Sequence, residues 1–174
     1  MKRPLAILAA VAALAALYLV LLRDTTSAGD LVTPPPAATI GSGPDAVAVG
    51  ADGTILPWLP LTEDAALPAL PLSSLPDGGR LAGTLLEQAR VLGAAPAALQ
   101  PYLVSSYYGE SGVDVELRSG IELRFGDASR LAAKWRAAAT ALADPSLSAL
   151  DYVDLHAPGH PSIGGSGHAL PPPP

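Results

Sequence analysis

The stretch VDVELRSGIELRF, residues 113–125, decides the fold of this chain. Its two halves, 113–117 and 121–125, alternate apolar and polar residues, which is typical of β-strands with one buried face. A three-residue turn at 118–120 brings every apolar side chain to the same face and places Gly120 where the turn needs a left-handed backbone. The predicted cross-strand pairs are Leu117 with Ile121, Val115 with Leu123, and Val113 with Phe125. The stretch therefore predicts a β-hairpin.

Further strands are expected on both sides of this hairpin. Upstream, an Asp-Gly turn between residues 46–49 and 54–56 predicts another hairpin. Residues 102–108 are rich in β-prone side chains, and residues 150–155 predict a last strand with apolar side chains on both faces. Between the first hairpin and the rest, residues 57–76 form a proline-punctuated loop whose apolar side chains, Trp58 included, are expected to cover the sheet.

Two helices are expected from apolar residues spaced three and four apart. One is predicted to begin with Asp77 as its cap and to end at Gly93, and the other to begin with Asp127 as its cap and to end near Leu142, before Pro145. The expected fold class is therefore α/β of the α+β type, a small domain of one mostly antiparallel mixed sheet with two main helices.

The N-terminus predicts a membrane anchor. Lys2 and Arg3 precede an uncharged run, residues 4–22, which as a helix would span roughly the 30 Å of bilayer hydrocarbon. The basic flank stays inside by the positive-inside tendency, so the rest of the chain is expected to be extracytoplasmic. A cleaved signal peptide is the alternative, because residues 26–28 are small. In either case the domain is exported.

The remaining boundaries follow from composition. Residues 1–23 are interpreted as a cytoplasmic tip and transmembrane anchor, and the proline- and glycine-rich residues 24–44 as a linker. Residues 45–163 form the predicted folded domain, and residues 164–174, with GGSG and four final prolines, are expected to be a disordered tail. The formal charge of −6 argues against nucleic-acid binding, and the lack of cysteine excludes disulfides and thiolate zinc sites.

Three segments together resemble a known family. They are the run LRSGIELRFG at 117–126, Lys134 eight residues later, and YVDLHAP at 152–158. In this order they look like the C-terminal β-domain of the FtsQ/DivIB bacterial cell-division proteins, in which a hairpin ending in Gly leads to a helix bearing a Lys and then to a strand ending in Asp-Leu. The anchor and the first hairpin are also similar, so that the resemblance covers about residues 46–158.

One departure from the family pattern is clear. Family members usually carry a polypeptide-transport-associated (POTRA) domain between the anchor and the β-domain, whereas only the short stretch 24–44 stands there in this chain. The resemblance therefore implies a reduced member, and it does not by itself imply the functions that the family assigns to the POTRA domain, which include part of the recruitment to the division site.

The resemblance implies a non-enzymatic scaffold of the divisome in the plasma membrane at the division septum. Its expected partners are division proteins of the FtsB/FtsL type, bound through the last helix and the final sheet edge. An open edge strand presents unpaired backbone groups that a partner strand can pair with. The candidate partner-binding residues are Tyr152, Val153, Asp154, Leu155 and His156. The alternative for each is an ordinary structural role, with Tyr152 and Val153 in the core and Asp154 at a solvated strand end.

Catalytic, cofactor and metal sites are not expected. A Ser-x-x-Lys nucleophile is absent, because Leu131 stands three residues before Lys134. His156 and His160 have a helical metal-ligand spacing, but Pro158 prevents the helix that would use it. No small-molecule substrate is expected either. The alternative function is an exported envelope module, either ligand-binding or structural, that has no role in division.

Overall fold

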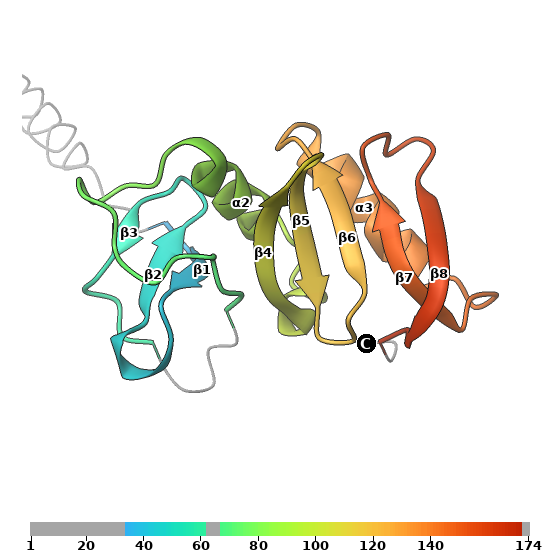
Figure 1. The fold of residues 1–174 in the computed structure, drawn as a ribbon, viewed down its shortest axis with the longest axis horizontal. Helices are drawn as coiled ribbons and strands as arrows, with labels where there is room; N and C mark the ends of the chain where they lie inside the picture. Colours follow the sequence, from blue (N-terminus) through green and yellow to red (C-terminus); the bar gives the residue numbers. More distant parts are fainter. Residues whose placement is uncertain (1–33, 62–66, 172–174) are drawn as a thin grey trace, which may run out of the picture. The chain divides into compact units, whose positions relative to one another are not determined.

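The computed structural model describes residues 34–61 and 67–171, and its strands form two sheets (Figure 1). The three-stranded sheet, in the order β1-β2-β3, consists of β1 (Pro36–Ile40), β2 (Val47–Gly50) and β3 (Ile55–Leu56). The five-stranded sheet, in the order β4-β5-β6-β7-β8, consists of β4 (Leu103–Gly109), β5 (Gly112–Leu117), β6 (Glu122–Gly126), β7 (Ala149–Asp154) and β8 (Ser162–Ala169). Neighbouring strands are antiparallel except β6 and β7.

The α-helices are α2 (Gly83–Gly93) and α3 (Leu131–Leu142), and two short 3-10 helices, η1 (Gly43–Asp45) and η2 (Gln100–Tyr102), lie in the connections. The expected α+β class with a mostly antiparallel mixed sheet and two main helices is therefore confirmed for the described residues. The strands divide into two sheets, however, where one sheet was expected.

The central hairpin, β5 and β6, forms as predicted in most of its length. Val115 pairs with Leu123, the Leu117 N–H donates to the Ile121 carbonyl at 2.9 Å, and Gly120 has a φ of 90°. The third predicted pair is wrong, because a bulge between Val113 and Asp114 moves Val113 opposite Gly126. The six apolar side chains of the hairpin are all buried, as the alternation requires.

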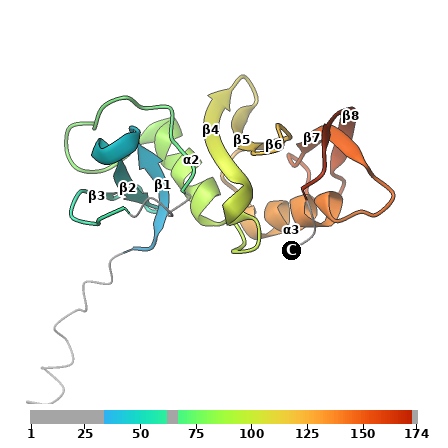
Figure 2. The same cartoon turned by 90° about the horizontal axis from the view of Figure 1, so that it is seen from below.

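The two helices contribute buried stripes to one core. On α3, Trp135 is buried with its ring centroid 4.7 Å from that of Phe125, and its Nε1–H donates to the Val91 carbonyl of α2 at 2.9 Å. In Figure 2, α3 runs along one face of the five-stranded sheet. The predicted helix caps are wrong: α2 follows Ala82 and α3 follows Arg130, and neither of these residues caps its helix with a side-chain hydrogen bond.

Among the residues that the structure describes, Ala69 bridges the two sheets. Ala69 lies between β1 and β4 and forms a parallel bridge to Thr39 on one side and to Ser105 on the other. Its N–H donates to the Val104 carbonyl at 2.8 Å, and its carbonyl accepts the Ser106 N–H at 3.1 Å. The proline-punctuated loop thus supplies one strand-like residue, and its neighbour Leu70 is buried as expected. Trp58 does not cover the sheet, since 64% of its surface is exposed.

Two predicted boundaries are wrong because segments rich in proline or glycine form strands. Residues 36–40 of the expected linker are β1, which buries Ala38 and Ile40 while it pairs with β2. Residues 164–169 of the expected disordered tail belong to β8, which pairs with β7. The folded region therefore begins before residue 45 and extends beyond residue 163.

The predicted anchor, residues 4–22, and the candidate cleavage site, residues 26–28, lie outside the described residues. Within 34–61 and 67–171, neither the length nor the hydropathy of any helix suits a membrane span.

Candidate functional site

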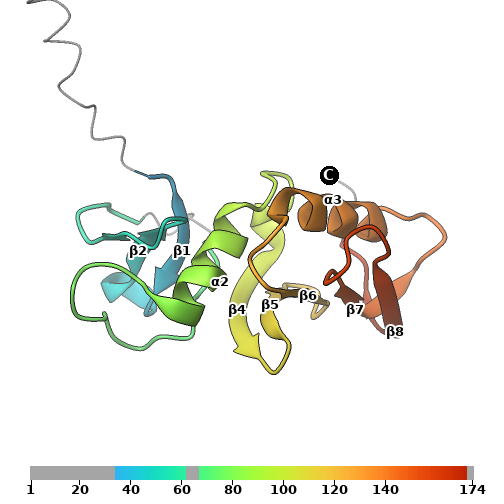
Figure 3. The ribbon, with the colours of Figure 1, turned by 90° about the horizontal axis from the view of Figure 1, so that it is seen from above.

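The expected open edge, residues 152–156, is not the edge of the sheet. β7 has β6 on one side, with Leu123 opposite Val153, and β8 on the other, with Val153 opposite Ile163. The last strand of the sheet order is therefore β8, as Figure 3 also shows. The prediction missed this because β8 lies in the glycine-rich segment that was interpreted as a tail.

The five predicted partner-binding residues have different environments. Val153 and Leu155 are fully buried and belong to the core, which confirms for Val153 the structural alternative. Tyr152 is half-buried, with the guanidinium carbon of Arg124 4.0 Å from its ring centroid. Asp154 is half-buried and His156 exposed. A partner can reach only the side chains of Tyr152, Asp154 and His156 without unfolding the strand.

β8 presents mostly backbone to its surroundings. Seven of its eight residues are exposed, and Gly164 is half-buried. Ile163 is the one large apolar side chain in the strand, and 42% of its surface is exposed. In the described part of the chain, no strand pairs with β8 on the side away from β7. The strand therefore offers a row of backbone donors and acceptors with little side-chain cover.

A groove lies between β8 and the outer side of α3. It has a volume of about 610 Å³, and Ile163 lies at the β8 side. Small residues, among them Ala133 and Ala137, line it on the α3 side together with Arg130 and Arg136. Side chains that project from a strand added to β8 on its helix-facing side would enter this groove.

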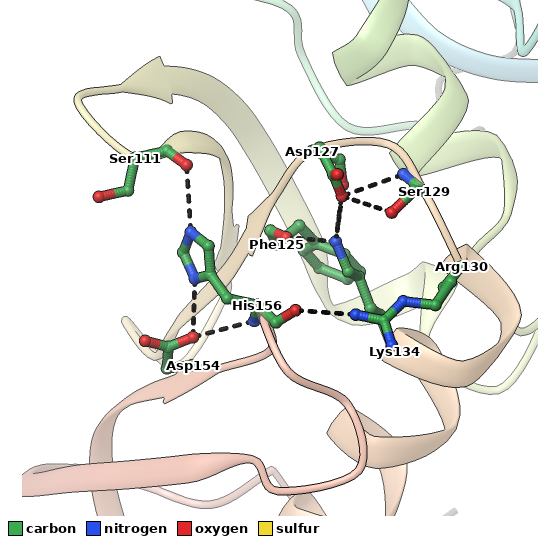
Figure 4. A network of polar contacts seen from close by, with 8 residues as sticks. All are labelled: Ser111, Phe125, Asp127, Ser129, Arg130, Lys134, Asp154 and His156. Atoms are coloured by element: carbon green, nitrogen blue, oxygen red, sulfur yellow. Dashed lines mark hydrogen bonds and ion pairs between the residues drawn. The ribbon is translucent and has the colours of Figure 1, made fainter.

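His156 ties the end of β7 to the neighbouring turn (Figure 4). Its Nδ1 lies 2.7 Å from Asp154 Oδ1, and its Nε2 lies 3.1 Å from the Ser111 carbonyl oxygen, in the turn between β4 and β5. The His156 carbonyl accepts a hydrogen bond from Arg130 Nη2 at 3.3 Å. Gly126 makes the close approach of the imidazole possible, because a Cβ there would lie 2.5 Å from the ring.

The arrangement around His156 favours the protonated ring. Both ring nitrogens face oxygen atoms that only accept hydrogen bonds, so only the imidazolium can donate to both. The hydrogen bonds to Asp154 and to the Ser111 carbonyl accordingly raise the pKa of His156. Burial alone would raise the pKa of Asp154, but the bonds from the backbone and ring of His156 lower it.

We expect this contact to make stability depend on pH. A raised pKa in the folded state means that the stabilisation is complete below the ordinary pKa of about 6.5 and is lost as the pH rises through the folded value. The melting temperature should therefore fall between pH 6 and pH 8. The fall should correspond to a loss of less than about 1 kcal/mol in the free energy of unfolding, because the pair of His156 and Asp154 is exposed. Melting curves of the wild type and His156→Gln across this range test it, with His160→Gln as the control.

His160→Gln changes a histidine in the next turn and should keep the wild-type slope. An equal slope in His156→Gln and the wild type would contradict this role of His156.

Lys134 holds the loop between β6 and α3 from inside. Its Nζ donates to the Phe125 carbonyl at 2.8 Å, to the Asp127 carbonyl at 2.9 Å and to Asp127 Oδ1 at 2.6 Å. The bonds from Lys134 and Ser129 lower the pKa of Asp127 strongly. Asp127 therefore binds Lys134 and Ser129 and does not cap α3, which explains the error in the predicted cap.

The face of the sheet opposite α3 carries a polar network. Tyr107 donates to Glu122, which also pairs with Arg124. Asp114 lies between Tyr107 and Arg124 in the strand register, and burial, followed by the charge of Glu122, raises its pKa to about 6. Glu122 therefore binds Tyr107 and Arg124 favourably, whereas its charge repels that of Asp114.

The described residues do not gather candidate metal ligands. Among residues 34–61 and 67–171, no three His, Cys, Asp or Glu side chains lie so that they could hold a metal ion. The absence of an enzymatic role stays a prediction.

Strand β8 left one signal in the sequence. Pro158-Gly159 is a turn signal, and the segment that follows it begins with Ser162 and Ile163. If this signal is taken as a turn between residues 150–155 and 162–169, it predicts the β7-β8 hairpin. The glycine-rich sequence GGSG nevertheless argued against a strand, because glycine is depleted in strands.

Comparison with known proteins does not assign the chain to a family. No protein-family model matches it, and no curated protein matches it significantly.

Proposed function

We propose that the chain is a membrane-anchored, non-enzymatic adaptor of the FtsQ/DivIB type, which binds division proteins of the FtsB/FtsL type at the septum of the plasma membrane. The partner strand adds to the exposed edge of β8. The observation that carries the proposal is that β8 ends the sheet with its backbone open.

The order of elements supports the proposal. A hairpin ending in Gly, a helix bearing a Lys and a strand ending in Asp-Leu stand in the order that the resemblance implies, and here they are β5-β6, α3 with Lys134, and β7 with Leu155 after it. The final edge is one strand further along the chain than the sequence indicated. Tyr152, Asp154 and His156 support this edge from β7, where Tyr152 packs against Gly164.

The groove beside β8 supports side-chain recognition. A strand paired with β8 would place alternate side chains over Ile163 and the alanines of α3, and the others over the opposite face. Main-chain hydrogen bonds would provide affinity, and the groove would select the side chains.

The proposal predicts that Ile163→Lys weakens partner capture. A lysine at this exposed edge position places a charge in the path of an added strand and beside Arg130 and Arg136. We expect affinity for an FtsB/FtsL-type pair to fall at least about tenfold, corresponding to about 1.4 kcal/mol. Titration of the full chain in detergent with the purified partner pair measures this.

Val104→Lys is the matched control. Val104 is also a β-branched strand residue, 41% exposed, but lies in β4 at the other end of the sheet. It should bind the partner pair as the wild type does, and both variants should keep the wild-type melting temperature. Capture by Ile163→Lys at wild-type affinity would overturn the β8 edge as the binding site. A fluorescent fusion that fails to gather at the septum would overturn the division role.

A second candidate function, an exported ligand-binding module, has one observation in its favour. An apolar groove of about 530 Å³ is lined by the end of α3, the segment before β4 and Leu170. Its size is typical of small-molecule sites. Binding of an apolar fluorescent probe that Leu142→Arg abolishes, with partner capture absent, would favour this candidate.

A further inference from the structure

The ladder between β7 and β8 is interrupted at Asp151. Leu150 pairs with His168 and Tyr152 pairs with Gly164, so that Asp151 alone on β7 stands opposite residues 165–167 on β8. β8 therefore carries two more residues than its partner in this interval, and it bulges away from β7.

The Asp151 carboxylate fills the bulge. Its Oδ1 accepts the Gly167 N–H at 2.7 Å. A Cβ at Gly165, where φ is +77°, would lie 1.9 Å from Asp151 Oδ2, and a Cβ at Gly167 would lie 2.6 Å from Oδ1. The two glycines are thus required by the position of this carboxylate, and the carboxylate takes the place that a backbone acceptor has in a regular ladder.

The sequence of β8 does little to fix its own register. Glycine-rich strands pair in more than one register, because they have no side chains that must reach a particular face. A slip of two residues keeps the same faces, and it would convert β8 into a regular strand with an unbroken edge. Long, flat and unbroken edges pair with the same edge of another copy.

We infer that Asp151 is a positioning residue that fixes the register of β8 and thereby keeps its outer edge broken into two short runs. A partner strand then pairs with the run that begins at Ser162 and ends at Gly164, and a second copy of the chain cannot pair along the whole of β8. Only the statement about the partner rests on the proposed function.

The test compares the self-association of three variants as full chains in detergent. Asp151→Ala removes the acceptor for the Gly167 N–H, whereas Asp151→Asn keeps an acceptor oxygen at the same place. We expect the protein mass of Asp151→Ala, measured by light scattering over increasing concentration, to rise toward twice that of the wild type. Asp151→Asn should behave as the wild type. Asp52→Ala, which removes another exposed acceptor of a backbone N–H in the β2-β3 turn, should also do so.

Amide exchange of Gly167 gives a second readout. The amide should lose its protection in Asp151→Ala and keep it in Asp151→Asn. Should Asp151→Ala fail to fold, Asp151→Ser replaces it, because a serine hydroxyl is too short to reach this amide. The inference would be overturned if Asp151→Ala or Asp151→Ser folds and keeps the wild-type mass. Self-association of Asp151→Asn would also overturn it.

The two proposals fail separately. If Asp151→Ala self-associates but Ile163→Lys still captures the partner pair, Asp151 fixes the register and the partner binds elsewhere. If Ile163→Lys loses capture but Asp151→Ala keeps the wild-type mass, the β8 edge binds the partner and Asp151 does not protect it.

Discussion

Replacing Lys134 by methionine should destabilise the domain by about 3 kcal/mol, because two carbonyls and a carboxylate lose their donor at once. Lys134 is 1% exposed, and its ammonium group uses all its hydrogens on Phe125 and Asp127. Methionine fills a similar volume, so a cavity does not account for the loss. Asp127 is 69% exposed and can regain water, which leaves the buried Phe125 carbonyl as the principal cost. Denaturant unfolding of the full chain measures the change in the free energy of unfolding.

Arg136→Met provides the matched control for this prediction. Arg136 lies two residues further along α3 and is exposed, so its loss should change the free energy of unfolding by less than about 0.5 kcal/mol. Equal losses in the two variants would show that the methionine harms the helix and that the hydrogen bonds of Lys134 do not stabilise the loop.

Gly112→Ala should be at least as costly, about 3 kcal/mol or more. Gly112 has a φ of +117°, and a Cβ there would lie 2.4 Å from the Gly126 carbonyl oxygen and 2.5 Å from its carbon. Both contacts are with backbone, so β5 and β6 must separate at their bulge to admit a methyl group. The displaced turn would carry the Ser111 carbonyl away from His156, and the pH dependence of melting should weaken in the same variant.

Gly159→Ala is the control for Gly112. Gly159 lies in the connection between β7 and β8, and a Cβ there would meet nothing within 4 Å. The variant should melt within a degree or two of the wild type, as surface substitutions usually do. A Gly112→Ala protein that melts as the control does would mean that the β5-β6 bulge adapts easily.

The parts of the fold that could be predicted are those in which side chains carry the pattern. Strict alternation along β5 and β6 fixed their pairing, and helical spacing predicted the burial of Trp135, Ala138 and Leu142 on α3 but not that of Lys134. The predicted register failed only at Val113, where the bulge depends on the close approach of Gly112 and Gly126. Such backbone contacts between strands leave no periodic mark in a sequence.

The candidate site could not be predicted because backbone and single polar contacts create it. Regular alternation would place the apolar residues at 150–155 on both faces, but the irregularity after Leu150 lets Leu150, Val153 and Leu155 all enter the core. The strand was interpreted as the final edge because the resemblance implies an edge there and the next segment was interpreted as a tail, although both its sides are paired. β8 owes its position to Tyr152 and Asp151, whose side chains leave room only for glycine.

The link at Ala69 has a mechanical consequence. Residues 68–70 join the three-stranded and five-stranded sheets: Pro68 and Leu70 bond to Thr39 of β1, and Ala69 bonds to Val104 and Ser106 of β4. The helix α2 also contacts both sheets. A chain that is held at the membrane and pulled at β8 would carry the tension through this narrow joint. The load would fall on the few hydrogen bonds at residues 68–70 and on the packing of α2, while the wider ladders on either side share it among many hydrogen bonds.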